Sequence, residues 1–324
     1  MIEPRIREAT LDDAELAADL MTASYPALAQ DPVITRYRWE HPRDGYAVGR
    51  YIAEHEGRPI AFLDWIHGPW EKLPDRHSEV DVSLDPRYLD QERLAFLYRW
   101  LETKVVEEGA KLVLAYCLED MPVYRAVFEE LGYERERSEK VWELDLKAEG
   151  TRLKREAVET ERKARAGGIT LTTLAAWQHP RKLEKLYELD ERTRHDIPHT
   201  LPILSETFED FKRRTGAPDR PADRYWIALD GDLPVALSYL RFPPIRGSVW
   251  TGYTCAHPDY RGRGLARAIK LQSLAQAVDL EIPFVYTDND SENAPMLHIN
   301  EQLGYQRRPG FIGHLKRVDT KVNA

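Results

Sequence analysis

The chain has 324 residues, more than a single hydrophobic core usually organises, and this length favours two domains. Apolar residues make up 42% of it and charged residues 31%, as in an ordinary globular protein. No apolar run reaches the roughly 20 residues that a membrane-spanning helix needs, and Met1–Thr10 lacks the apolar centre of a signal peptide. We therefore expect a cytoplasmic protein without a membrane partner.

The net charge of −9 is concentrated in the first half of the chain. Residues 1–146 contain 18 Lys and Arg against 31 Asp and Glu, whereas residues 169–324 contain 21 against 20. Because phosphate binding needs a positive field, the acidic half argues against nucleic acid as a partner. It would suit a cationic amine, although a merely solubilising surface carries the same charge.

The cysteines, Cys117 and Cys255, lie far apart in two apolar runs. Such positions are typical of buried thiols that behave as small hydrophobic side chains. Their spacing matches no metal-ligand pattern, so no metal site is expected.

Strands and helices alternate along the first half, and the second half repeats their order. The first half predicts a strand at Pro4–Glu8, a helix from Thr10 or Asp12, strands at Tyr46–Glu54, Ile60–Ile66, Glu79–Leu84, Lys111–Cys117 and Val141–Leu146, and helices at Arg93–Glu108 and Pro122–Leu131. The second half predicts strands at Ile169–Thr173, Arg224–Leu229, Val235–Arg241, Val249–Ala256, Phe284–Thr287 and Gly313–Val318, and helices at Arg181–Arg192, Ser205–Arg214, Leu265–Val278 and Ala294–Leu303.

Residues 147–168 separate the two halves. They are rich in Lys, Arg, Glu and Ala and end in Gly167-Gly168, which predicts a linker helix with a glycine stop. The repeated order, together with Leu-Gly-Tyr at 131–133 and 303–305, indicates an internal duplication. The expected fold is α/β, with two tandem domains (1–146 and 169–324) that each contain a mixed, mostly antiparallel sheet flanked by helices.

A glycine-rich turn joins the strand that ends at Thr254-Cys255-Ala256 to the following helix. Its sequence is Arg261-Gly262-Arg263-Gly264-Leu265-Ala266. Consecutive backbone N–H groups in such a turn bind anions, and the helix N-terminus adds about half a positive charge. The glycines let a pyrophosphate approach the backbone, and the arginines can donate hydrogen bonds to it. The segment predicts a site for a nucleotide diphosphate, the alternative being a turn that only connects a strand to a helix.

At this segment the sequence resembles the GNAT family (Gcn5-related N-acetyltransferases), in particular its tandem-domain members, the group that includes mycothiol synthase. Residues 261–266 match the family's Arg/Gln-x-x-Gly-x-Gly/Ala signature, and Thr287–Met296 with Ile299–Tyr305 resembles its next landmark. The resemblance implies acetyl-CoA as co-substrate, with its pantetheine arm beside Thr254 and hydrogen-bonded by the main chain of Cys255 and Ala256. It also implies cofactor contacts for Asn289 and Asn293, which are equally typical of a turn residue and a helix cap.

The first half resembles the family more loosely and lacks this loop. Its equivalent segment, Asp85–Leu94, contains no glycine. Asp90 and Glu92 place negative charge where a pyrophosphate would bind. We therefore expect residues 1–146 to keep the fold without binding the cofactor.

The catalytic residues are less clearly marked. The glutamate base common in the family is absent, because residues 245–257 contain no carboxylate, and Asn300 occupies the position of the usual tyrosine acid. Tyr253 is a candidate, although core packing also explains it. Asp196, in the segment His195–His199, is a second candidate for binding or deprotonating an amine, and a solvated loop residue is its alternative interpretation.

Together these features predict an acetyl-CoA-dependent N-acetyltransferase that acts on a small-molecule amine, with its activity in residues 169–324. Two alternatives stay open. One is a mycothiol-synthase-like acetyltransferase whose acceptor is a cysteinyl glycoside, and the other is a module that binds acetyl-CoA without turnover.

Overall fold

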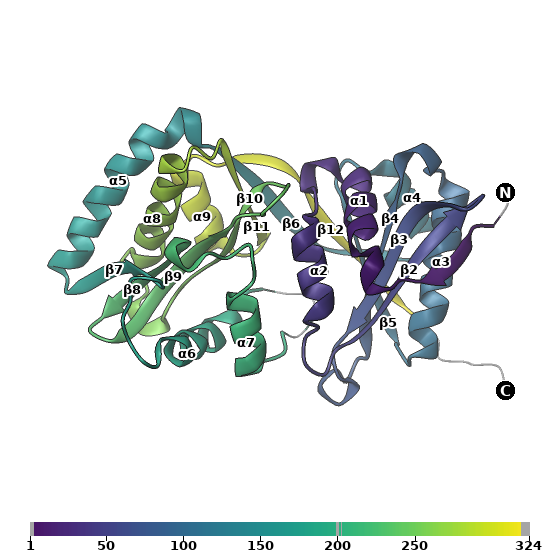
Figure 1. Ribbon diagram of the computed structural model, residues 1–324, viewed down its shortest axis with the longest axis horizontal. Coiled ribbons are helices and arrows are strands. Elements are labelled where there is room, and N and C mark those ends of the chain that lie inside the picture. The colour runs from purple at the N-terminus through teal and green to yellow at the C-terminus, as the bar shows by residue number, and fades with distance from the viewer. Residues whose placement is uncertain (1–2, 199–200, 202, 319–324) are drawn as a thin grey trace. The chain divides into compact units, whose positions relative to one another are not determined.

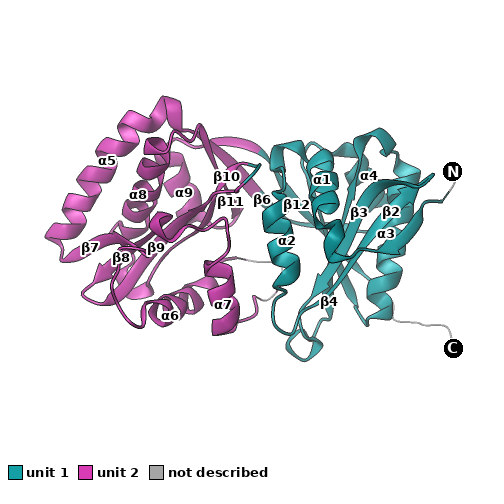
Figure 2. Cartoon of the chain, viewed as in Figure 1, with its two compact units in different colours: residues 1–139, 245–247, 309–324 teal, residues 140–244, 248–308 magenta. Residues whose placement is uncertain are grey.

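The computed structural model describes residues 3–198, 201 and 203–318, which divide into two compact units. Unit 1 contains residues 1–139, 245–247 and 309–324, and unit 2 contains residues 140–244 and 248–308 (Figure 2). Within the described ranges, no helix combines the length and the apolar character needed to cross a bilayer. The same ranges hold no cluster of three or more His, Cys, Asp or Glu residues suited to a metal ion.

Unit 1 is a mixed sheet with helices on both faces (Figure 1). Its strand order is β1-β2-β3-β4-β5-β12, antiparallel except for the parallel pair β4 and β5. The elements are β1 (Arg5–Glu8), α1 (Ala14–Ser24), α2 (Pro32–Glu40), β2 (Ala47–His55), β3 (Arg58–His67), β4 (His77–Leu84), α3 (Gln91–Glu107), β5 (Leu112–Leu118), α4 (Pro122–Glu130) and most of β12 (Gln306–Arg317).

Unit 2 has the strand order β6-β11-β10-β9-β8-β7, in which β10 and β11 are parallel. The elements are the second half of β6 (Glu134–Asp145), α5 (Leu146–Ala166), β7 (Ile169–Thr173), α6 (Lys182–Arg194), α7 (Phe208–Thr215), β8 (Tyr225–Asp230), β9 (Leu233–Arg241), β10 (Val249–Ala256), α8 (Leu265–Asp279), β11 (Phe284–Asp290) and α9 (Ala294–Leu303). Short 3-10 helices lie at η1 (Leu11–Asp13), η2 (Pro26–Leu28), η3 (Trp70–Lys72), η4 (Pro86–Tyr88), η5 (Ala222–Arg224) and η6 (Pro258–Tyr260). The predicted α/β class with a mixed, mostly antiparallel sheet is confirmed.

The last strand of each half of the sequence lies in the sheet of the other unit. Val141–Leu146 was expected to close the first half and Gly313–Val318 the second. In the structure β12 pairs antiparallel with β5 over Phe311–Arg317, and β6 is the neighbour of β11. The compact units therefore differ from the expected boundaries at 146 and 169. Alternation along a strand fixes which face is buried but does not identify its partner strand, so the exchange has no local signature.

Helix α5 packs along unit 2, whereas the sequence predicted a polar linker at 147–168. Asp145 caps its start by accepting hydrogen bonds from the first N–H groups of the helix. Leu153 and Ala157 are buried in the same cluster as apolar residues of α8. Gly150 permits the close approach of the two helices, because a Cβ atom there would lie 2.9 Å from the side chain of Val278.

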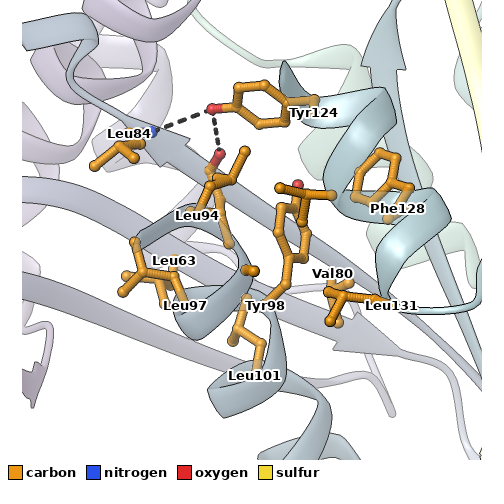
Figure 3. Packing of buried hydrophobic residues seen from close by; sticks show 14 of the residues in the cluster. Leu63, Val80, Leu84, Leu94, Leu97, Tyr98, Leu101, Tyr124, Phe128 and Leu131 are labelled. Carbon is orange, nitrogen blue, oxygen red and sulfur yellow. Dashed lines mark hydrogen bonds between the residues drawn. The ribbon is translucent and has the colours of Figure 1, made fainter. Parts of the chain in front are cut away.

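Alternate residues along the unit 1 strands face opposite layers. Ile52 and Phe62 pack against α1, whereas their neighbours Ala53 and Leu63 join the larger core under α3 and α4. This larger core is drawn in Figure 3, with side chains from the sheet and both helices, among them Val80, Leu94, Leu97, Tyr98, Leu101 and Phe128.

Candidate functional site

Strand β10 pairs with its two neighbours over different lengths. Against β9 the pairing reaches Ala256, whereas against β11 it covers Val249 and Trp250. The register shifts at Gly252, where a Cβ atom would lie 2.0 Å from the Tyr239 ring, so this bulge requires glycine. Beyond Trp250 the strands β10 and β11 separate, and β10 presents an open edge of main chain.

The orientation of this edge follows from one hydrogen bond. The His257 N–H donates to the Val235 carbonyl on β9 at 2.8 Å. Because main-chain groups alternate in direction along a strand, those of Cys255 also face β9, whereas those of Thr254 and Ala256 face the opening. Of the three residues predicted to line the cofactor arm, Thr254 and Ala256 therefore turn their main-chain groups toward the opening and Cys255 turns its groups toward β9.

The loop after β10 leaves the start of α8 without a cap. Gly262 and Gly264 have φ angles of +76° and +74°, in the left-handed region that favours glycine. Gly264 is the N-cap residue and offers no side chain to the first N–H groups of α8, and the first turn contains no acidic residue. These amides and the helix dipole therefore form a concentration of positive potential at the end of the open edge.

The open edge and the start of α8 line one cavity of about 660 Å³. The lining residues come from the end of α6, from β10, from the loop and α8, and from α9. They are Thr193, Asp196, Ile197, Tyr253, Thr254, Cys255, Ala256, Tyr260, Arg261, Gly262, Gly264, Leu265, Ala266, Arg267, Asn293, Pro295, Met296, His298, Ile299 and Gln302.

The two loop arginines differ in position. Arg261 lines the cavity, and its guanidinium forms an ion pair with Asp196, with each side chain 49% exposed. Arg263 is not among the lining residues and stacks on the ring of Tyr260, with 4.7 Å from its guanidinium carbon to the ring centroid. The sequence candidate Asp196 thus lies against the phosphate loop, and His199 lies outside the described residues.

The two candidate asparagines, Asn289 and Asn293, also differ in position. Asn293 lines the cavity and caps α9, where its side chain accepts a hydrogen bond from the Met296 N–H at 3.4 Å. Asn289 lies on β11 and is not among the cavity-lining residues. Its side-chain oxygen accepts a hydrogen bond from Asn300 at 2.6 Å.

Two side chains of β10 bear on the chemistry of the site. The Tyr253 hydroxyl donates to the Thr193 hydroxyl at 3.0 Å, and burial raises the pKa of Tyr253 above its usual value. Burial also raises the pKa of the Cys255 thiol to about 12. At neutral pH Tyr253 therefore holds its proton, and Cys255 is not a thiolate nucleophile.

Comparison by sequence places this site in a known family. Residues 183–305 match the Acetyltransferase (GNAT) family. This part of the chain is a GNAT domain. No curated protein matches the chain by sequence.

Solved structures with a similar fold cover the whole chain. A GCN5-related N-acetyltransferase from Sphaerobacter thermophilus is 18% identical with a TM-score of 0.68, covering 98% of this chain and 96% of its own. A tandem GNAT protein from the clavulanic acid biosynthesis pathway is 16% identical with a TM-score of 0.74, covering 97% and 98%. The predicted tandem GNAT fold is confirmed.

In unit 1 the loop that corresponds to residues 261–264 is shorter and ends in a side-chain helix cap. Two residues, Leu89 and Asp90, separate η4 from α3, whereas four residues, 261–264, separate η6 from α8. The Asp90 carboxylate accepts a hydrogen bond from the Arg93 N–H at 2.7 Å and so caps α3. One amide at the start of α3 is therefore satisfied by a side chain, whereas the start of α8 has no side-chain cap.

Tyr124 fills the strand opening of unit 1. β4 pairs with β5 as far as Val80, so the strands separate as in the GNAT domain. The buried Tyr124 hydroxyl donates to the Val82 carbonyl at 2.9 Å and accepts from the Leu84 N–H at 3.5 Å (Figure 3). Counted from the shared Leu-Gly-Tyr, its counterpart is Met296, which lines the cavity of unit 2. Tyr124 thus occupies the opening between β4 and β5.

Sequence reasoning missed one buried lysine in the GNAT domain. Lys270 of α8 is fully buried, and its Nζ donates to the Asn300 side-chain oxygen at 2.8 Å. Burial lowers its pKa to about 7, and the charge of Asp288 opposes this shift. The available signal was a lysine between Ile269 and Leu271 in a helix that is otherwise mostly apolar.

Proposed function

We propose that the GNAT domain of unit 2 is an acetyl-CoA-dependent N-acetyltransferase that acts on a small-molecule amine. The observation that carries the proposal is the continuity of the open β10 edge with the uncapped start of α8 in one cavity. Coenzyme A has the same two parts in the same order, an amide-containing arm that ends in a diphosphate. Membership of residues 183–305 in the GNAT family supports acetyl transfer.

The residues present fit this molecule. The main-chain groups of Thr254 and Ala256 are oriented to pair with the pantetheine amides as an added strand would. The amides of residues 262–266 and the N-terminus of α8 suit the diphosphate. Arg261 supplies a charge-assisted hydrogen bond to a phosphate oxygen once it leaves Asp196.

In the proposed reaction, the amine nitrogen forms a bond to the thioester carbon and the carbon–sulfur bond breaks. The nitrogen loses a proton and the leaving thiolate gains one. Holding the two reactants in contact supplies much of the rate. Tyr253 lines the cavity with its proton retained, so we assign it as donor to the thiolate rather than as base.

Thiol release from acetyl-CoA across a panel of primary amines, including a cysteinyl glycoside, tests this function. We expect release with at least one amine, and we expect Tyr253→Phe to lower kcat by about 100-fold, the lower end for a general acid. Acetyl-CoA affinity should change less than twofold in that variant. Thr193→Val, which removes the partner of the Tyr253 hydroxyl and keeps the phenol, is the matched control and should retain most of the rate.

Two results would count against the assignment. Tight acetyl-CoA binding without thiol release from any amine would favour the non-catalytic module, and rapid turnover of the cysteinyl glycoside alone would favour the mycothiol-synthase-like alternative. A fully active Tyr253→Phe variant would remove Tyr253 from the reaction.

Asp196→Asn is expected to tighten acetyl-CoA binding. The Asp196 carboxylate competes with the diphosphate for Arg261, and an exposed ion pair of this kind is worth about 0.2–1 kcal/mol. The Kd measured by titration calorimetry should therefore fall by up to about fivefold. An unchanged Kd with a kcat reduced about 100-fold would instead identify Asp196 as the base.

A further inference from the structure

A chain of hydrogen bonds runs from the core of unit 2 to the separated part of β11. Lys270 Nζ donates to Asn300 Oδ1 at 2.8 Å, and Asn300 Nδ2 donates to Asn289 Oδ1 at 2.6 Å. Lys270 and Asn300 are fully buried, whereas Asn289 is partly exposed. Asn289 lies three residues beyond Tyr286, where the pairing of β11 with β10 ends. The chain thus leads from α8 through α9 to the part of β11 that is no longer paired with β10.

The lysine determines the direction of every bond in this chain. Lys270 Nζ donates its hydrogen bond, so the oxygen of Asn300 faces Lys270. The side-chain nitrogen of Asn300 then faces Asn289 and donates a hydrogen bond to its side-chain oxygen. The remaining polar atom, Asn289 Nδ2, is a donor and has no hydrogen-bond partner among the described residues.

The surroundings of Lys270 leave Asn300 as its main partner. Asp288 on β11 acts on Lys270 through its charge, yet no carboxylate of the described chain lies within ion-pair distance of Nζ. The Tyr305 ring lies 4.9 Å from Nζ and adds a cation–π contact. Burying a lysine without a paired carboxylate destabilises the fold, and such positions are more typical of functional groups than of packing residues.

We propose that Lys270, acting through Asn300, is a positioning residue that holds the amide nitrogen of Asn289 as a hydrogen-bond donor for a carbonyl oxygen of bound acyl-pantetheine. The proposal rests on the function proposed above. A lysine at this place sets the polarity of the asparagine pair, which the asparagines alone would not determine.

Asn300→Asp separates this role from a purely structural one. The new carboxylate would still contact Lys270, now as an ion pair. A contact between α8 and α9 would therefore persist. It can only accept, however, so Asn289 must turn over to donate to it and then presents oxygen to the cofactor. Lys270→Met tests the same point differently, because it leaves both asparagines free to turn.

Titration calorimetry with acetyl-CoA, alongside thermal unfolding, measures both effects. We expect Asn300→Asp to raise the Kd at least tenfold without loss of thermostability. Lys270→Met should raise the Kd about threefold to tenfold and lower the thermostability, because the buried Asn300 oxygen loses its partner. Gln272→Met is the matched control, since Gln272 is also buried on α8 and donates to the Ala157 carbonyl at 2.9 Å outside the chain. Its Kd should equal that of the wild type.

The possible results are distinct. If the wild-type protein binds acetyl-CoA and both variants bind it equally well, Lys270 has no positioning role and the proposed function stands. If the wild type does not bind acetyl-CoA, the proposed function and this inference both fail. Should Asn300→Asp fail to fold, Lys270→Met decides alone, because replacing a buried ammonium by an apolar side chain of similar length is compatible with the core.

Discussion

Gly264→Glu is expected to abolish measurable acetyl-CoA binding, with a Kd raised at least 100-fold. Gly264 is the N-cap of α8 at φ +74°, and its amide lies among those that suit the diphosphate. A side chain there meets no neighbour within 4 Å, so glutamate is tolerated sterically and costs about 1–2 kcal/mol of backbone strain. Its carboxylate would occupy the anion site and repel the diphosphate. Titration calorimetry measures the loss, and thermal unfolding checks the fold.

Two controls isolate the charge at the site from the strain. Gly231→Glu places the same side chain on another glycine of unit 2 with positive φ (+55°) and open space around it, away from the cavity. It should bind acetyl-CoA normally. Substitutions at Tyr88 or Leu89 in the closed loop of unit 1 should also leave the Kd unchanged. A Kd within threefold of wild type for Gly264→Glu would show that the diphosphate binds elsewhere.

Tyr124→Ala is expected to destabilise unit 1 by roughly 3–5 kcal/mol, the range for a large buried aromatic side chain. Tyr124 is 1% exposed, and its hydroxyl satisfies main-chain groups of the β4 edge. Tyr124→Phe keeps the ring and removes the hydroxyl, so the Val82 carbonyl loses its partner and about 1–3 kcal/mol should be lost. Urea denaturation gives both values.

Tyr98→Phe is the matched control for the hydroxyl. Tyr98 belongs to the same core and is fully buried, but its hydroxyl has no hydrogen-bond partner within the described part of the chain. Removing it should leave stability unchanged or slightly higher. Equal losses in the two Phe variants would show that Tyr124 contributes packing alone and does not satisfy the open edge.

Much of the fold follows from local patterns in the sequence. The strand Val249–Ala256 and the strand Ile169–Thr173 have the predicted bounds, because alternating apolar residues between turn signals leave little ambiguity. Helix α2 (Pro32–Glu40) was missed, since its few apolar residues do not form a clear stripe, although Asp31 followed by proline is a typical helix start. The first residues of β6 were missed because Glu134–Lys140 is dominated by charges.

The candidate site also has one part that local sequence predicts and another part that it does not. The phosphate loop is contiguous in sequence, so its glycines and Arg261 could be assigned from spacing. The contact of Tyr124 with Val82, the ion pair of Arg261 with Asp196, and the bond from Lys270 to Asn300 each join residues at least 30 positions apart. Such contacts depend on how helices pack on the sheet, which no local pattern specifies.

Titration of the wild-type protein with acetyl-CoA tests the central claim most directly, because that claim assigns an open strand edge and an uncapped helix to unit 2 and closed equivalents to unit 1. One molecule of acetyl-CoA should bind per chain. A stoichiometry of two would show that the contacts of Asp90 and Tyr124 do not close the first unit, and the absence of binding would show that the second unit is not an acetyl-CoA site.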